Sequence, residues 1–354
     1  MASFSTVFLL LSLVCLASPC AAQRVICEAP PCTALSQVKT TPTNRASHVR
    51  LPEGVTGAES LAFDSSNRGP FTGVSDGRVL KWGGDSAGWT TFAYSPNYRS
   101  SPTCAASSEE TESTCGRPLG LAFHLKTGIL YFADAYKGLM RVGPRGGQAD
   151  VLATEADGVP FNYLNGVDVD QDTGDVYFTD SSTTITRRYQ ENIMRNRDAT
   201  ARLMKYDAKT KQVTVLKDRL PYANGVAVSH DGRYLVVAHT GPAQVFRYWL
   251  KGAKAGQYEL FADLPGYPDN VRRDAKGGYW VGLNREKITF NVPAAAAAAA
   301  SPAKHLVGVR LNGDGVEVEE LTAASRAVTL SEVVERDRKL WLGSVDLDYV
   351  GLLQ

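Results

Sequence analysis

Several absences narrow the functions open to this sequence of 354 residues. Charge of one sign is not in excess, since 38 basic residues face 37 acidic ones, and no run of Lys or Arg would form a phosphate-binding stripe. The five histidines lack zinc-type spacing, and neither a Gly-x-Ser-x-Gly elbow nor a phosphate-cradling glycine loop occurs. These absences argue against a nucleic-acid partner, a serine hydrolase and a nucleotide-dependent enzyme.

Long apolar runs are scarce as well, and the one that stands out lies at the N-terminus. It spans residues 7–17 and is followed at 20–22 by the small residues that a signal peptidase reads. Because it is too short and wrongly flanked for a membrane span, we predict a signal peptide over 1–22, with an uncleaved anchor as the alternative. No other segment approaches spanning length. We expect a soluble, monomeric protein of the secretory pathway, vacuolar or extracellular, with an N-terminal extension at 23–50.

Cysteine is sparse, and its count is informative. Removal of the signal peptide leaves four cysteines, Cys27, Cys32, Cys104 and Cys115, and an even number in an oxidising compartment suggests two disulfides. Cys104 and Cys115 bracket a polar loop that a bridge would tie down by restricting the unfolded chain. Cys27 and Cys32 could close a small loop around two prolines, and their pairing stays open.

A weak internal repeat runs through the rest of the chain. In each copy a strand opening is followed ten residues later by a second strand of β-branched and aromatic residues, and a glycine-bearing turn joins the two. Six copies are present, three that align without gaps and three that are looser: Gly120, Gly166, Gly225, Glu59, Asp269 and Ser331. Such hairpin units, 45 to 62 residues apart, predict an all-β fold, a six-bladed β-propeller with four-stranded antiparallel blades over 51–354.

Two insertions interrupt the repeat. One covers residues 183–202 and is polar with some helical character, and the other covers 291–305 and contains seven consecutive alanines. In a propeller such insertions lie over one face, and we expect them to border the mouth of the channel. The alanine run is compatible with a short capping helix or with an irregular loop.

Oxygen-bearing side chains recur where the predicted inner strands begin. They are Glu59, Asn165, Asn224, Asp269 and Asn270, and the repeat directs them toward one axial pocket. Two carboxylates and three amides offer hard ligands with a charge of minus two, which suits Ca²⁺. Asn-Gly and Asp-Asn are also common turn pairs, and for any one residue that simpler interpretation stands. Their recurrence favours a shared metal site, at which a cation would polarise an ester or lactone carbonyl while Asp269 or Glu59 accepts a proton from water.

Several stretches resemble strictosidine synthase-like proteins, and the conserved region of that family falls at about 164–252 here. They are Asp175–Ser182, Leu203–Asp207, Asn224–Val226, Phe246–Gly252 and Pro268–Arg273. The likeness extends from about Ala58 to the end, and the loop from Cys104 to Cys115 resembles the disulfide loop of strictosidine synthase. The resemblance implies a six-bladed propeller related to gluconolactonases and paraoxonases, and the five oxygen-bearing residues match the calcium ligands of those relatives.

The resemblance fails at the residues expected to do chemistry. Strictosidine synthase joins tryptamine to secologanin by a Pictet-Spengler condensation, and the glutamate that serves as its acid/base falls on Ser331 here. Glu332 is adjacent, but a shift of one residue on a strand turns a side chain to the opposite face. Where paraoxonases carry a proposed catalytic histidine, this chain has Leu119.

We therefore interpret the sequence as a strictosidine synthase-like secretory protein that hydrolyses an ester or lactone with the help of Ca²⁺. Its substrate would be a small molecule, and Asp269 and Glu59 are the candidate catalytic residues. Two alternatives remain. One is Pictet-Spengler condensation, with Glu332 as acid/base if a local bulge restores the register. The other is a non-catalytic, ligand-binding propeller in which the metal only pins the blades.

Overall fold

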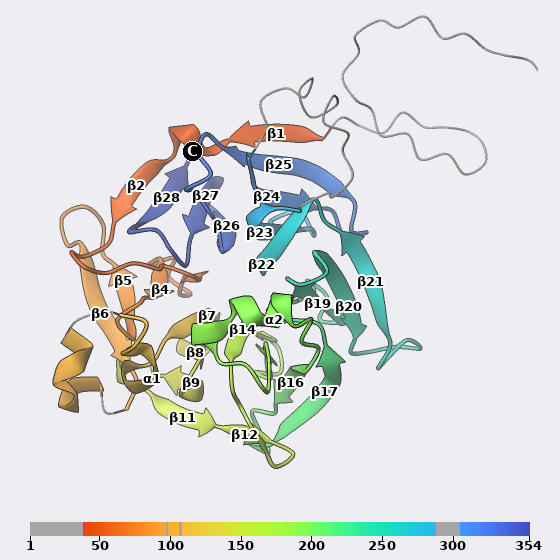
Figure 1. The fold of residues 1–354 in the computed structure, drawn as a ribbon, viewed down its shortest axis with the longest axis horizontal. Helices are drawn as coiled ribbons and strands as arrows, with labels where there is room; N and C mark the ends of the chain where they lie inside the picture. The colour runs from red at the N-terminus through yellow and green to blue at the C-terminus, as the bar shows by residue number, and fades with distance from the viewer. Residues whose placement is uncertain (1–37, 97, 106–107, 288–304) are drawn as a thin grey trace, which may run out of the picture. The chain divides into compact units, whose positions relative to one another are not determined.

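A computed structural model describes residues 38–96, 98–105, 108–287 and 305–354 of the chain. Within them the strands form six sheets around a central axis, each with four antiparallel strands, which confirms the predicted six-bladed β-propeller (Figure 1). The predicted signal peptide, the pair Cys27 and Cys32, and the alanine run lie outside the described residues. No helix in the described ranges is long and apolar enough to cross a membrane.

The first three blades follow one another along the chain. Blade one contains β3 (Leu61–Ala62), β4 (Phe71–Gly73), β5 (Arg78–Trp82) and β6 (Trp89–Tyr94), with β10 (Gly147–Gln148) added parallel to β6. Blade two contains β7 (Pro118–His124), β8 (Ile129–Asp134), β9 (Gly138–Val142) and β11 (Asp150–Ala153). Blade three contains β14 (Leu164–Val169), β15 (Val176–Asp180), β16 (Ala201–Tyr206) and β17 (Val213–Leu220). A small hairpin of β12 (Glu155–Ala156) and β13 (Val159–Pro160) lies between blades two and three in the sequence.

The other three blades complete the ring. Blade four contains β18 (Ala223–Val228), β19 (Tyr234–His239), β20 (Gln244–Trp249) and β21 (Tyr258–Asp263). Blade five contains β22 (Gly266–Arg273), β23 (Tyr279–Glu286), β24 (His305–Leu311) and β25 (Glu317–Ala323), with β1 (Lys39–Pro42) added parallel to β25. Blade six contains β26 (Glu332–Arg336), β27 (Lys339–Gly343), β28 (Tyr349–Leu353) and β2 (Ser47–Arg50).

The ring is closed by a strand from the other end of the chain. β2 pairs antiparallel with β28, so the outer strand of blade six comes from the N-terminal side (Figure 1). The predicted boundary at residue 51 is corrected, because β1 and β2 lie in the segment 23–50 that we had assigned to an extension. Most residues of β2 are exposed, so the strand lacks the apolar alternation by which a sequence reveals a strand.

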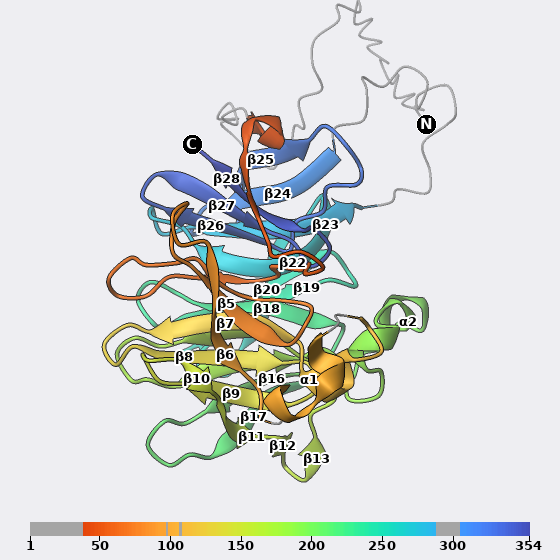
Figure 2. The ribbon, with the colours of Figure 1, turned by 90° about the vertical axis from the view of Figure 1, so that its left-hand side faces the viewer.

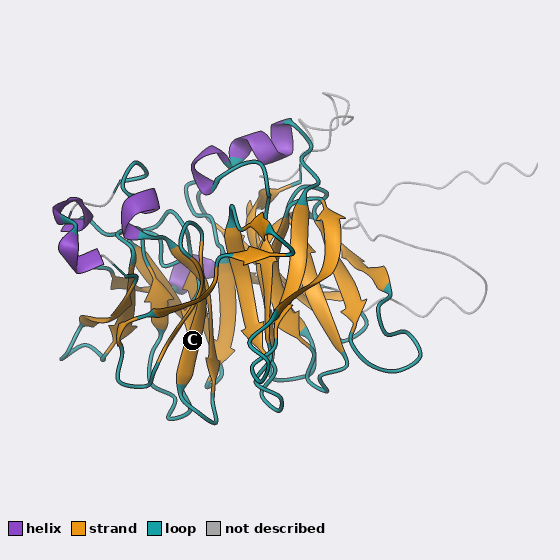
Figure 3. Cartoon of the chain, turned by 90° about the horizontal axis from the view of Figure 1, so that it is seen from below, coloured by secondary structure: helices purple, strands orange, loops and turns teal. Residues whose placement is uncertain are grey.

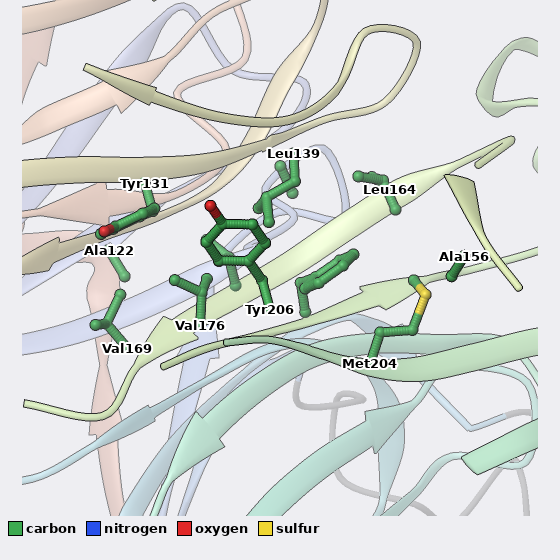
Figure 4. Packing of buried hydrophobic residues seen from close by; sticks show 12 residues of the cluster. Ala122, Tyr131, Leu139, Ala156, Leu164, Val169, Val176, Met204 and Tyr206 are labelled. Atoms are coloured by element: carbon green, nitrogen blue, oxygen red, sulfur yellow. The ribbon is translucent and has the colours of Figure 1, made fainter. Parts of the chain in front are cut away.

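The hydrophobic core lies between neighbouring blades. Every residue of the inner strands β14 and β18 is buried, whereas exposed residues are frequent in the outer strand β17. Figure 4 shows one such interface, in which Tyr131 of blade two lies in one cluster with Val176, Met204 and Tyr206 of blade three. Burial of apolar area between the blades is the main favourable contribution to this fold, and it sets the inner strands around the axis.

The inner strands are bent where they enter the channel. In β14, Leu164 pairs with Asp180 but Val167 pairs with Phe178, so one extra residue forms a β-bulge between them. The strands β7, β18 and β22 have the same shift at the equivalent place. A bulge redirects the side chain that it carries, and here it does so at Leu119, Asn165, Asn224 and Asp269.

Glycine after the bulge lets adjacent inner strands touch. A Cβ atom at Gly166 would lie 2.5 Å from the carbonyl oxygen of Asn224, and one at Gly225 would lie 2.5 Å from the Cα atom of Asn270. The glycines that open the repeats are thus required by close approach between blades, while the turn glycines supply positive φ, as at Gly174 with φ of 79°.

The two α-helices of the described residues lie on one face of the propeller (Figures 2 and 3). α2 (Glu191–Arg195) and the 3-10 turn Arg187–Tyr189 belong to the predicted insertion 183–202. α1 (Glu112–Cys115) is tied by a disulfide between Cys104 and Cys115, the bridge expected from the sequence. The remaining 3-10 turns are Thr43–Arg45, Tyr98–Ser100 and Pro102–Ala105.

Candidate active site

A cavity of about 320 Å³ lies on the axis at the face that carries α2. Its floor is formed by residues from the inner strands, its walls include Tyr163, Tyr222 and Tyr267, and residues of the segment 183–202 border its mouth. The cavity therefore combines a polar floor with aromatic walls, an arrangement common in small-molecule sites.

The floor is a ring made by equivalent positions of the blades. Glu59, Asn165, Asn224 and Asp269 line the cavity from blades one, three, four and five, and each is at most 6% exposed. The equivalent position of blade two holds Leu119, which also lines the cavity. Four of the five predicted metal ligands are thus brought together at one place.

Hydrogen bonds fix the orientation of the two amides. The Ser181 hydroxyl donates to the carbonyl oxygen of Ala223 at 2.8 Å, so it accepts from Asn165 Nδ2 at 3.1 Å. In the same way the Thr240 hydroxyl donates to a carbonyl oxygen in blade five at 2.7 Å and accepts from Asn224 Nδ2 at 3.1 Å. Because each hydroxyl has one proton to give, Nδ2 must face it, and Oδ1 is left on the other side.

Three acceptor oxygens of the ring have no donor. Asn270 Nδ2 donates to Glu59 Oε1 at 2.8 Å, which places this fifth predicted ligand against Glu59 and outside the cavity wall. Glu59 Oε2, Asn165 Oδ1 and Asn224 Oδ1 are buried and without a hydrogen-bond partner. Each such acceptor costs about 1–3 kcal/mol, and a cation in the ring would satisfy all three. Oxygen-only donors with two carboxylates fit Ca²⁺.

The ionised forms of the two ring carboxylates are disfavoured when no cation is bound. Burial raises the pKa of Glu59 to about 8, and the nearby charge of Asp269 adds to the rise. Burial also raises the pKa of Asp269 to about 7. A divalent cation would favour the ionised form of both. The described ranges hold no group of three or more His, Cys, Asp or Glu side chains suited to a metal, since the ring offers two carboxylates and otherwise amides.

The two residues considered for condensation chemistry lie elsewhere. Ser331 occupies the ring position of blade six, where its hydroxyl accepts a hydrogen bond from the backbone N–H of Val345 at 2.8 Å. Glu332 is fully buried outside the cavity wall, and its carboxylate accepts from the backbone N–H of Leu61 at 2.6 Å and from Arg272 Nε at 2.8 Å. Glu332 is therefore placed as the alternation of a strand predicts, away from the cavity.

Residues near the mouth were not identified from the sequence. The Tyr163 hydroxyl donates to Gln190 Oε1 at 2.9 Å, and Tyr222 does so at 3.5 Å. Arg187 from the neighbouring 3-10 turn also lines the cavity. The only signal for these residues was the position of the insertion 183–202, which identified a covering segment but none of its contacts.

Comparisons with known proteins agree with this description. A sequence profile described as strictosidine synthase matches residues 165–253. Protein STRICTOSIDINE SYNTHASE-LIKE 10 of Arabidopsis thaliana is 41% identical over 321 residues, which cover 84% of this chain and 85% of that protein.

Two solved structures share the fold. A gluconolactonase from Xanthomonas campestris has a TM-score of 0.62 at 16% identity, over 88% of this chain and 90% of that one. Regucalcin from Agrobacterium tumefaciens, a calcium-binding protein, has a TM-score of 0.57 at 14% identity, over 89% of this chain and 95% of that one.

Proposed function

The chain belongs to the strictosidine synthase family, and we propose that it hydrolyses an ester or lactone with Ca²⁺ held by Glu59, Asn165, Asn224 and Asp269. The observation that carries the proposal is the set of three buried acceptor oxygens without a donor in one cavity floor. The gluconolactonase and the calcium-binding protein that share the fold support the choice of reaction and cation.

The residues of the site divide the work. Ca²⁺ bound in the ring supplies the positive charge that polarises a substrate carbonyl and lowers the pKa of water nearby. Asp269 is the general base, because its carboxylate lines the cavity and a cation in the ring would keep it ionised and able to accept a proton. Tyr163 and Tyr222 hold the substrate between aromatic walls, and the segment above them limits the entry of water.

Condensation chemistry is not part of the proposal. An acid/base must reach the reacting atoms, and Glu332 lies outside the cavity wall with both carboxylate oxygens occupied. The family match therefore supports the fold, and the proposed reaction is argued from the residues of the ring.

Turnover on a panel of esters and lactones, with Ca²⁺ and with EDTA, tests the proposal. We expect activity on at least one ester or lactone that EDTA removes, and a loss of at least about a hundredfold in Asp269→Asn. Asp172→Asn is the matched control, because Asp172 is an exposed aspartate in the turn that follows β14, beyond the end of the strand opposite to Asn165. Turnover that persists in EDTA would contradict the metal. A metal that stabilises the fold without changing turnover would favour the non-catalytic alternative.

We also propose that the protein acts in the secretory pathway, in the vacuole or outside the cell. The disulfide between Cys104 and Cys115 supports an oxidising compartment. N-terminal sequencing of the mature protein is the test: we expect Gln23 as the first residue, and a product that begins at Met1 would contradict cleavage.

A further inference from the structure

Arg187 is the one charged residue of the covering segment that is buried against the cavity. Its side chain is 10% exposed, and its Nε donates to Glu112 Oε2 at 3.1 Å. The neighbouring Glu191 also lines the cavity but is 79% exposed, so solvent screens it. Arg187 thus presents a permanent positive charge to the substrate from a poorly hydrated place.

The carboxylate beside Arg187 is shared with a second arginine, so it does not fully neutralise Arg187. Glu112 is 5% exposed and is shared with Arg117, whose fully buried Nε lies 3.2 Å from Glu112 Oε1. Two guanidinium groups therefore compete for one carboxylate. Buried charge without a full partner is costly, and one positive charge in this pair is left for another anion.

The carboxylates of the ring can compensate this positive charge only while no cation is bound to them. When all are ionised, Glu59, Asp269 and Glu112 place three carboxylates against the two guanidinium groups of Arg117 and Arg187, an excess of one negative charge. A doubly charged cation turns this into an excess of one positive charge. In the loaded site, Arg187 and Arg117 would then share Glu112 as their one carboxylate without a metal, and one positive charge would be left uncompensated.

We propose that Arg187 binds a carboxylate of the substrate, so that the esters or lactones hydrolysed here are those that also carry an acidic group. This inference rests on the proposed function, because the excess positive charge arises when Ca²⁺ occupies the ring. The planar fork of a guanidinium suits the two oxygens of a carboxylate. Glu112 accepts a hydrogen bond from Arg187 Nε, and Tyr163, which bonds both Arg187 and Gln190, helps to orient the guanidinium at the mouth.

Arg187 is the better candidate than the other arginine of the wall. Arg285 lines the cavity too, but it is exposed, and its guanidinium carbon lies 5.9 Å from the ring centre of Tyr267. A hydrated surface cation adds little binding energy. Arg187 is also near enough to Asp269 that its charge opposes the rise that burial causes in the pKa of Asp269. A carboxylate on Arg187 would hold the substrate next to the proposed general base.

Ligand-induced change in Tm tests the inference without relying on turnover. Glutarate and its neutral diamide, glutaramide, are titrated into the Ca²⁺-loaded protein. We expect glutarate to raise Tm and glutaramide to do so far less, because only glutarate offers an anion to Arg187. In Arg187→Gln the apparent affinity for glutarate should fall about ten- to a hundredfold. Arg188→Gln is the control, since Arg188 pairs with Glu110 at the surface and should leave the affinity unchanged.

Each outcome decides one point. Equal shifts from glutarate and glutaramide in the unaltered protein overturn the inference, and this comparison needs no variant to fold. An unchanged affinity in a folded Arg187→Gln protein overturns it as well. The rise in Tm from Ca²⁺ alone reports on the proposed function. If Ca²⁺ has no effect, that function fails, and the anion site is judged by glutarate without metal: a shift lost in Arg187→Gln supports it, and no shift overturns it.

Discussion

The central channel has two levels of polar side chains, built from neighbouring positions of the inner strands. The levels differ in whether these side chains find hydrogen-bond partners within the protein. The cavity level is the ring of Glu59, Asn165, Asn224 and Asp269, and three of its acceptors have no donor. The inner level consists of Ser60, Arg272 and Glu332, one or three residues further along their strands. Residues of both levels are largely buried, so burial alone does not distinguish them.

The inner level is internally satisfied. The Arg272 guanidinium donates to Glu332 Oε2 at 2.8 Å, to Ser60 Oγ at 2.6 Å and to the carbonyl oxygen of Leu121 at 3.0 Å. Its partners come from blades one, two and six while it belongs to blade five, so a single side chain ties the blades across the axis. The contrast teaches that unmet hydrogen-bonding capacity marks the place for a ligand, whereas a complete network marks a structural level.

The largest expected effect comes from breaking the inner level. Arg272→Met would leave the Glu332 carboxylate buried without its cation, which costs about 3–5 kcal/mol in the free energy of unfolding. Urea unfolding in EDTA measures this loss. Arg273→Met is the comparison, because Arg273 is 27% exposed and lies 3.5 Å from Asp168 Oδ2, a carboxylate that keeps hydrogen bonds from the backbone N–H groups of Val169 and Val228 without it. We expect this variant to lose less, about 1–2 kcal/mol. Equal losses in the two variants would contradict a special role for the inner level.

Filling the cavity level should have the next largest effect. Ca²⁺ at a hundred times its Kd should raise the free energy of unfolding by about 2.7 kcal/mol relative to EDTA, because only the folded chain brings the ring together. Thermal or urea unfolding with and without Ca²⁺ measures the difference. The increment should survive in Glu332→Gln, which removes no oxygen ligand of the ring and takes away a negative charge near Glu59. A Ca²⁺ increment that disappears in Glu332→Gln would show that the two levels are not independent.

The sequence predicted those features of the fold that recur in each repeat. Six strand openings with hairpin turns give the propeller, and their equivalence places Asn165, Asn224 and Asp269 on one ring. The bulges that aim these side chains recur with them, so the alignment found the ring without knowing its geometry.

Features made by single, non-repeated contacts escaped prediction. Glu112 and Arg187 are 75 residues apart and meet only because α1 and the covering segment share a face. The closing strand β2 is mostly exposed and shows no strand pattern. The direction of each amide depends on a hydroxyl that itself donates across to the next blade, as Thr240 does for Asn224. Such relations exist only in three dimensions.

The smallest expected effect sharpens the comparison most. Asn224→Ala removes an unpartnered acceptor together with the hydrogen bonds of its amide to Thr240 and Asp269. In EDTA the loss of the two bonds is partly offset by the loss of the unpartnered acceptor, so the free energy of unfolding should fall by only about 1 kcal/mol. In Ca²⁺ the same variant should lose most of the increment, because a ligand is gone. The control Asn162→Ala removes an amide that is bonded to the carbonyl oxygen of Ser182 and does not line the cavity, and its Ca²⁺ increment should match that of the unaltered protein. A residue that serves stability alone would lower the free energy of unfolding in EDTA when it is replaced. A large loss in EDTA, together with an unchanged increase on adding Ca²⁺, would therefore mean that Asn224 belongs with the structural level.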